Sequence, residues 1–234
     1  MDIFHILAGF IVGLLVGLTG VGGGSLMTPI LLIFFNQPAA VAVGTDLLYA
    51  AITKSAGIFA HGKLGNIDWR IVRLLAFGSV PASILTTALL GNMDIASESA
   101  VATIKFWLGI ALMLTALSVI FRKQLASLSK NGHWVNPKYA PTLTVLLGIV
   151  LGSLVTLTSV GAGALGVTAL LILYPKVSIT KIIGTDVAHA VPLTLVAGLG
   201  HVSLGTVDYS LLGTLLIGSI PGIWIGSHLS AKVA

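Results

Sequence analysis

Two glycine-rich segments interrupt apolar stretches of the chain. They are residues 20–25, with the sequence GVGGGS, and residues 161–164, with the sequence GAGA. Glycine allows left-handed backbone conformations and a close approach of the main chain to a ligand. When a short helix follows such a break, its free amides and its dipole suit an anion. We therefore predict an anion site at the two breaks, formed by Gly20, Gly22, Gly23, Gly24, Ser25, Gly161 and Gly163.

Polar side chains inside neighbouring apolar stretches complete this candidate substrate-binding site. Lys54 can supply positive charge to an anion. His189 can couple transport to protons, because histidine titrates near neutral pH. Tyr49 and Thr53 are separated by one helical turn and lie close to Lys54 along the chain. We expect these four residues to contact the substrate.

Asp46 and Asp186 lie in the same stretches, and two roles are open for them. Each follows a Gly-Thr pair typical of a helix start, so we expect each aspartate to cap the helix that begins beside it. The alternative is a role in coupling. The glycine-rich breaks also have a second interpretation, in which they only permit close helix packing, as we expect of Gly9, Gly13 and Gly17.

The remaining motifs favour neither a metal site nor catalysis. His61 and His201 lie at the ends of apolar stretches, where an interfacial or helix-dipole role is expected in preference to metal ligation. Residues 161–166 match the dinucleotide-binding fingerprint GxGxxG, but they follow an apolar helix and not a strand. No HExxH or GxSxG motif is found in the sequence. We expect no enzymatic activity, no cofactor and no metal.

The composition places these residues in a membrane. Hydrophobic residues make up 56% of the chain and charged residues 8%, which leaves too little polar surface for a water-soluble protein. Several apolar stretches are about long enough to cross a hydrocarbon core of ~30 Å as helices. They are residues 3–18, 43–60, 71–90, 103–121, 141–158, 183–200 and 210–229. The sequence therefore predicts an all-α polytopic membrane protein.

An internal repeat divides the chain into two halves. Residues 44–81 match residues 184–221 at a fixed spacing of 140 residues, and the glycine-rich segments match at a spacing one residue shorter. In this alignment His189 stands where Tyr49 does. Each half is predicted to contain a long helix, a glycine-rich break, a short helix, a helix that opens Gly-Thr-Asp and a further long helix.

The distribution of charge predicts that the two halves have opposite orientations. Basic residues that flank apolar stretches are expected in the cytoplasm, whereas the acidic loops 91–100 and 201–209 fit the outside. These basic residues are Lys63, Arg70, Arg73, Arg122, Lys123, Lys130, Lys138, Lys176, Lys181 and Lys232. Residues 3–35 and 141–174 then form helix–break–helix hairpins that enter from opposite sides and meet near the midplane.

Three segments follow from this alignment. Residues 1–121 form a first transmembrane repeat, residues 122–140 a basic cytoplasmic loop, and residues 141–234 a second transmembrane repeat. The second repeat has no counterpart of the helix at 103–121, so we expect its last helix to be missing from this chain.

The motifs resemble those of the TauE/SafE family of sulfite exporter-like permeases. The resemblance is carried by residues 17–24 with the following Pro29, and by residues 44–54. It extends over essentially the whole chain, including residues 184–186 and 218–221. It implies an inner-membrane permease with broken helices, which handles sulfur oxyanions or organosulfonates such as sulfite or sulfoacetate, often by export.

We therefore expect a permease that carries a small anion by alternating access between the two glycine-rich breaks. An anion channel, and a membrane scaffold or sensor without transport, are the alternatives. The expected partners are the anionic substrate and the lipid bilayer. No nucleic acid is expected, because the basic residues are scattered over loops, and a homodimer is left open.

Overall fold

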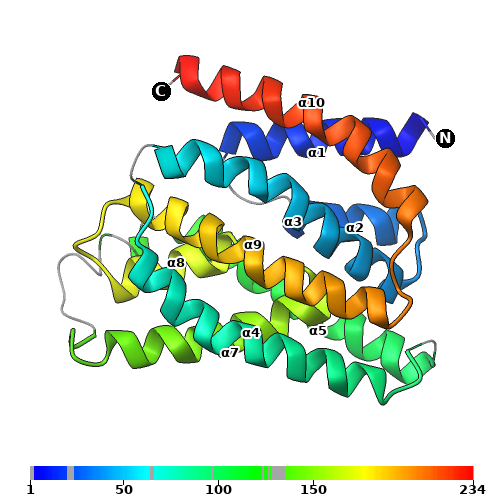
Figure 1. Ribbon diagram of the computed structural model, residues 1–234, viewed down its shortest axis with the longest axis horizontal. Helices are drawn as coiled ribbons and strands as arrows, with labels where there is room; N and C mark the ends of the chain where they lie inside the picture. Colours follow the sequence, from blue (N-terminus) through cyan, green and yellow to red (C-terminus); the bar gives the residue numbers. More distant parts are fainter. Residues whose placement is uncertain are drawn as a thin grey trace.

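The computed structural model describes residues 3–19, 24–63, 66–95, 97–122, 124–125, 127 and 135–233, with the backbone alone for residues 19, 24–25, 56–63 and 230–233. Within these ranges the chain is helical and forms no strand. The long and short helices are α1 (Ile3–Thr19), α2 (Gly24–Ile33), α3 (Ala39–Lys63), α4 (Trp69–Gly91), α5 (Glu98–Ile120), α7 (Ala140–Thr158), α8 (Ala164–Leu173), α9 (Ile179–Ser203) and α10 (Tyr209–Val233) (Figure 1).

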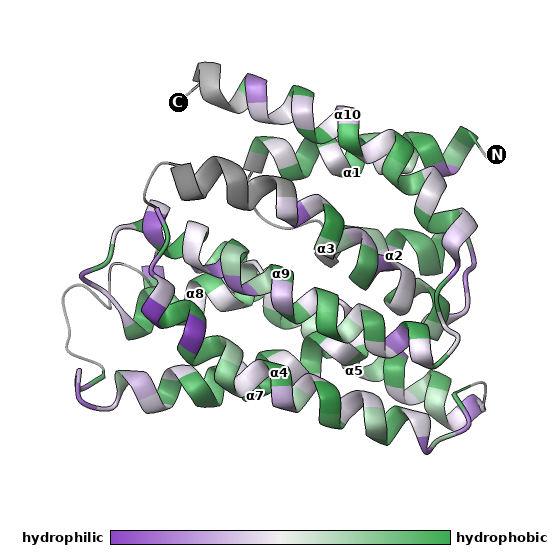
Figure 2. Ribbon diagram, in the orientation of Figure 1, coloured by the Kyte–Doolittle hydropathy of each residue, from purple (hydrophilic) through white to green (hydrophobic). Residues whose placement is uncertain are grey.

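The helices have the length and surface of a membrane protein, which confirms the predicted all-α polytopic fold. Among the described residues, α4, α5, α7, α9 and α10 are long and apolar enough to span a bilayer. Their outer faces carry large exposed hydrophobic side chains such as Phe77, Phe106 and Trp224. Figure 2 shows hydrophobic colour along the helix bodies and most of the hydrophilic colour at their ends and in the connections. Lipid is the solvent that suits such a surface.

Two pairs of parallel helices form the flanks of the molecule, with α1 against α10 and α4 against α7 (Figure 1). Small residues make the contact between each pair. A Cβ atom at Gly13 would collide with the backbone of Ser219, and one at Gly152 would collide with the backbone of Ser79. Gly9 and Gly17 meet α10 in the same way, so the close packing predicted for the glycines of α1 is confirmed.

Helices α3 and α9 cross the centre of the molecule side by side (Figure 1). They run antiparallel, because Gly44 faces His201 while Gly198 faces Leu48. These are the matching helices of the two repeats. Two equivalent helices that pack antiparallel are related by a two-fold axis perpendicular to both helices. Halves of inverted orientation would be related by such an axis.

Equivalent hydrogen bonds are exchanged between the halves. The amide of Asp208 donates to Thr45 Oγ1 at 3.0 Å, and the amide of Asp68 donates to Thr185 Oγ1 at 2.8 Å. Each of these residues matches its counterpart at the spacing of 140 residues. The exchange supports the predicted repeat. The orientation of each half in the bilayer and the repeat boundaries at 1–121 and 141–234 stay predictions.

The helices that carry Asp46 and Asp186 begin earlier than predicted. Helix α3 begins at Ala39 and α9 at Ile179, so both Gly-Thr-Asp sequences lie inside helices. The glycines serve packing instead, because a Cβ atom at Gly44 or Gly184 would collide with a loop carbonyl of the other half. The prediction that Asp46 and Asp186 cap helices is therefore wrong.

Other residues provide the N-terminal caps of α9, α4 and α10. The hydroxyl of Ser178 accepts the amide of Lys181 at the start of α9. Asp68 caps α4 by accepting the amides of Arg70 and Ile71. Its counterpart Asp208 accepts the amide of Leu211 at 2.9 Å in the first turn of α10.

Candidate functional site

The break between α7 and α8 has the backbone conformation that the glycines predict. Gly161 has a φ of 122° and Gly163 a φ of 132°, both in a region that residues with a Cβ atom rarely adopt. Ser159 is left-handed as well, with a φ of 58°. No side chain caps the N-terminus of α8. The amides of Gly166 and Val167 donate to the carbonyl oxygens of Gly161 and Gly163, whereas the amides of Ala164 and Leu165 precede the first intrahelical hydrogen bond. This segment therefore offers main-chain donors to a ligand.

This break lies in the protein interior and not against lipid. Val160 and Ser159 are buried, and Ala162 is 8% exposed. The Thr158 hydroxyl holds the turn from within, since it accepts the amide of Val160 at 3.1 Å. Irregular backbone at membrane depth requires this kind of cover, because lipid cannot satisfy its polar groups.

The matching break of the first half lies largely outside the described residues. Gly20, Gly22 and Gly23 belong to the undescribed segment 20–23, and their predicted role stays a prediction. Gly24 begins α2, and only the backbone of Ser25 is described.

Lys54 joins the two halves at the second break. Its side chain is 4% exposed, and Nζ donates a hydrogen bond to the carbonyl oxygen of Ala162 at 3.1 Å. An ammonium group has three donors. The structure thus brings together the lysine and the break that the sequence analysis assigned to one site, although they lie far apart in the chain.

Asp46 and Asp186 are buried near this lysine, each turned toward the short helix of its own half. Thr28 on α2 donates to Asp46 Oδ2 at 2.5 Å. A Cβ atom at Gly166 on α8 would collide with Asp186 Oδ1. Both carboxylates interact electrostatically with Lys54. Each carboxylate retains one oxygen without a hydrogen-bond partner among the described residues.

His189 and Tyr49 occupy matching places next to serines of the other half. His189 Nε2 is 2.8 Å from Ser79 Oγ on α4, and its Nδ1 has no described partner. Tyr49 interacts with Ser219 on α10, the residue that matches Ser79 in the repeat. These contacts position the two side chains around the centre of the molecule.

The structure gives Thr53 a local role. Its hydroxyl donates to the carbonyl oxygens of Tyr49 at 2.8 Å and of Ala50 at 3.3 Å within the same helix. A hydroxyl that is used in this way has only its lone pairs left, and these do not attract an anion. Of the substrate-contacting residues predicted in α3, Lys54 therefore has the geometry best suited to an anion.

His201 differs from its predicted interfacial position. It lies in the last turn of α9, but it is 1% exposed, with Nδ1 2.8 Å from Thr206 Oγ1 and Nε2 3.0 Å from the carbonyl oxygen of Thr156. Both ring nitrogens are used to join α9 to α7 and to the following loop. The side chain of His61 lies outside the described residues. In the described part of the chain, no group of three His, Cys, Asp or Glu side chains is placed to hold a metal.

Sequence analysis missed two polar residues at the site. Arg122, counted there only as a flanking basic residue, follows α5 and acts electrostatically on Asp186, and its Nη2 is buried without a described partner. Ser159 lies beside the Asp46 carboxylate. Ser159 could have been found from the sequence, because it aligns with Gly20 when the two glycine-rich segments are matched. No sequence pattern pointed to Arg122.

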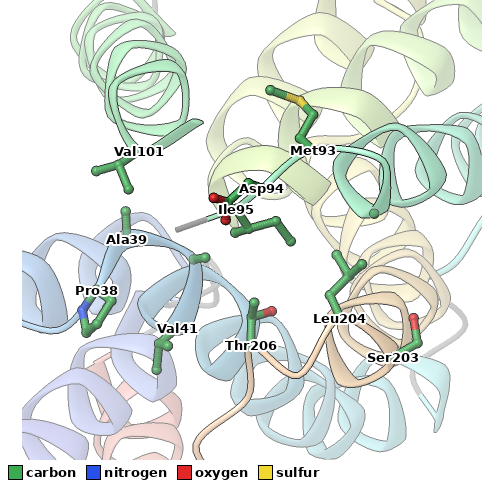
Figure 3. A pocket seen from close by; sticks show the side chains of 12 residues that line it. Pro38, Ala39, Val41, Met93, Asp94, Ile95, Val101, Ser203, Leu204 and Thr206 are labelled. Atoms are coloured by element: carbon green, nitrogen blue, oxygen red, sulfur yellow. The ribbon is translucent and has the colours of Figure 1, made fainter. Parts of the chain in front are cut away.

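A pocket of about 660 Å³ opens at the end of α3 where Ala39 begins the helix (Figure 3). Residues 91–95 and 203–206, together with Val101 of α5, form its other walls, and Thr206 is the partner of His201. Asp94 is its charged group, and none of the predicted substrate-binding residues lines it. The pocket is therefore separate from the predicted anion site.

The apolar outer surface and the helices long enough to span a bilayer define a multi-pass membrane protein, with a buried lysine at a helix break in its interior. The match to known families agrees. The model of the family described as "Sulfite exporter TauE/SafE" matches residues 5–234, and the chain belongs to this family. It is a membrane transporter.

Curated relatives share almost the full length of the chain. It is 42% identical to "Probable membrane transporter protein YjnA" of Bacillus subtilis (strain 168), over 99% of this chain and 91% of the relative. It is 28% identical to "Probable membrane transporter protein YdhB" of the same strain, over 96% and 89%. A protein of Methanocaldococcus jannaschii, "Probable membrane transporter protein MJ0441", is 29% identical over 97% and 84%. No solved structure matches the chain.

Proposed function

We propose that this transporter carries a small anion across the bilayer and binds it at the start of α8 with Lys54. The hydrogen bond of 3.1 Å from Lys54 Nζ to the carbonyl oxygen of Ala162 carries this proposal. It holds a positive charge next to the uncapped amides of α8, where the helix dipole also favours negative charge. Cation, amides and dipole then act on the same bound anion.

The proposed substrate is a sulfur oxyanion or an organosulfonate, such as sulfite or sulfoacetate, and the proposed direction is export. Support comes from the description of the matched family as a sulfite exporter. A tetrahedral or pyramidal oxyanion presents several acceptor oxygens at once, which suits a site made of main-chain amides and one ammonium group. The proposed location is the inner membrane of a cell.

The proposed mechanism is alternating access between the two halves. Helices α3 and α9 pack antiparallel at the centre, and each half supplies part of the site, with Lys54 from the first and the α8 break from the second. A small rotation of one half against the other would move the anion from one aqueous side to the other without moving it far from either element.

Flux through proteoliposomes tests this function. We expect labelled sulfite or sulfoacetate to exchange across the membrane with saturation and with stimulation by unlabelled substrate on the opposite side. Flux without saturation or trans-stimulation would identify a channel, and no flux with either anion would contradict the proposal.

Removal of Lys54 tests the site. We expect Lys54→Ala to lower exchange roughly tenfold or more, because a hydrogen bond to a charged group contributes about 1.5–3 kcal/mol. Lys138→Ala removes an exposed lysine from a loop and is the matched control, with exchange expected at the level of the unmodified protein. Normal exchange by a correctly folded Lys54→Ala variant would place the anion elsewhere.

A further inference from the structure

Asp46 and Ser159 each have a buried oxygen without a hydrogen-bond partner among the described residues. Asp46 is 0% exposed, and while its Oδ2 accepts the Thr28 hydroxyl at 2.5 Å, its Oδ1 accepts nothing. Ser159 is 4% exposed and its Oγ is likewise unpaired, although the hydroxyl lies beside the Asp46 carboxylate. Such groups are costly in a protein interior within a membrane, which makes this pair a candidate for binding something.

The charged and titratable groups around Asp46 come from several helices. On its own helix these are Tyr49 and Lys54. Helix α2 and the α7–α8 break supply the hydroxyls of Thr28 and Ser159. The facing helix α9 supplies Asp186, which acts on Lys54, and His189, on which Lys54 acts. Helix α5 is followed by Arg122, which acts on Asp186. Helix α10 supplies the neutral hydroxyl of Ser219 next to Tyr49.

These groups set the charge of the site. The carboxylates of Asp46 and Asp186 face the cations of Lys54 and Arg122, so the site is close to neutral when all four are ionised. Arg122 acts on Asp186, whereas the cation that acts on Asp46 among the described residues is Lys54, which is shared with Asp186. A bound anion adds a further negative charge and competes with Asp46 for the same ammonium group. The negative charges of the anion and of the Asp46 carboxylate also repel each other, and this repulsion is strong in an environment of low dielectric constant.

We propose that Asp46 binds a proton when the anion occupies the α7–α8 break, and that the proton crosses the membrane together with the anion. The proton comes from the aqueous side to which the site is open and is released with the anion on the other side. In the ionised state the Ser159 hydroxyl can donate to the Asp46 carboxylate, and when Asp46 Oδ1 carries the proton the direction reverses, so that Oδ1 donates and Ser159 Oγ accepts. This inference rests on the anion transport proposed above.

Linking the proton to Ser159 joins the two halves in the loaded state. Asp46 belongs to the first half, and Ser159 belongs to the break of the second half that would hold the anion. The direction of net flow then depends on both gradients. Export of an anion made in the cytoplasm would be driven by its own outward gradient and would carry protons outward.

Two measurements in proteoliposomes separate this inference from the proposed function. The first is exchange of labelled sulfoacetate at equal pH on both sides, which requires no net proton movement. The second is sulfoacetate uptake driven by an acidic outside, with the membrane potential clamped by potassium and valinomycin and the internal pH followed by a trapped dye. We expect the unmodified protein to accumulate sulfoacetate and to acidify the vesicle interior as it does so.

Three variants test whether Asp46 and Ser159 carry the proton coupling. Asp46→Asn is expected to lose the part of uptake that depends on the pH gradient, measured relative to its own rate of exchange. Ser159→Ala is expected to keep coupled uptake and to show it at a less acidic outside pH, because the ionised Asp46 carboxylate loses a neighbouring hydroxyl donor. Glu98→Gln removes an exposed carboxylate at the start of α5 and is expected to retain both exchange and coupled uptake.

The outcomes are distinct. Absence of exchange in the unmodified protein contradicts the proposed function. Exchange that is normal, together with uptake that ignores the pH gradient or follows a sodium gradient instead, overturns the proton inference and leaves the anion function standing. Coupled uptake by Asp46→Asn at the rate of the unmodified protein also overturns it.

Discussion

At the scale of single residues, the buried charges of the site are only partly paired. Lys54 directs one of its donors to a backbone carbonyl, and in the described part of the chain Oδ1 of Asp46 and Oδ1 of Asp186 have no hydrogen-bond partner. A structural ion pair would be expected to satisfy its members more completely, because an unpaired polar group in the interior costs about 1–3 kcal/mol. Incomplete pairing in the middle of a transporter fits groups that exchange partners during transport.

Arg122 is the residue-scale prediction. Its buried Nη2 has no described partner and its guanidinium acts on Asp186, so we expect Arg122→Gln to weaken anion binding and raise the KM for sulfite exchange severalfold, with less effect on the maximal rate. Arg122→Lys should recover part of the affinity. A rise in KM that Arg122→Lys does not reduce at all would indicate a role in packing.

The sequence predicted the residue types of this site better than their contacts. Lys54 and the break at 161–164 were assigned to one site because each has a chemical property that suits an anion, and the structure places them in contact. The prediction for the aspartates was wrong because Gly44 and Gly184 were interpreted as helix starts. Both glycines lie inside continuous helices, where they allow a loop of the other half to come close. Contacts between halves leave no local pattern in the chain.

At the scale of elements, the parallel helix pairs depend on the absence of side chains. Helices in lipid gain little from burying apolar surface, so close backbone contact is their main source of attraction. Ser79 shows how tightly packing and site are connected, because its backbone meets Gly152 while its hydroxyl meets His189. The helix pair α4 and α7 therefore positions part of the site.

The element-scale prediction concerns Gly152. We expect Gly152→Leu to lower the thermal stability of the protein in detergent, by about 1–3 kcal/mol or more, because its side chain would overlap the Ser79 backbone. Gly109→Leu is the control, since a Cβ atom there meets nothing within 4 Å. Equal melting temperatures for the two variants would contradict the close packing of α4 and α7.

At the scale of the whole molecule, equivalent residues of the two halves make equivalent contacts with each other. Thr45 and Thr185 each accept the amide of an aspartate in the opposite half. One ion contact departs from this symmetry, as Lys181 Nζ lies 4.0 Å from Asp68 Oδ2 while the residue that matches Lys181 is Val41. The two ends of the protein thus differ in their contacts, and the pocket lies at the end with Val41.

The whole-molecule prediction is the opposite orientation of the halves. Asn36 and Lys176 are matching exposed residues in the turns before α3 and α9, and the protein contains no cysteine that would interfere with labelling. In intact cells we expect an impermeant maleimide to label Asn36→Cys and to label Lys176→Cys only after the membrane is permeabilised. Labelling of both from the same side would show that the halves are parallel.

The crossed pairing of helices constrains how the protein is made. Of the described helices, α1 is synthesised first, whereas its parallel partner α10 is synthesised last. Until then the glycine face of α1 has no protein surface to meet, and it must wait in the lipid or against an insertion factor. Translation that stops before α10 would therefore leave Gly9, Gly13 and Gly17 of α1 without the helix backbone that they meet in the complete fold.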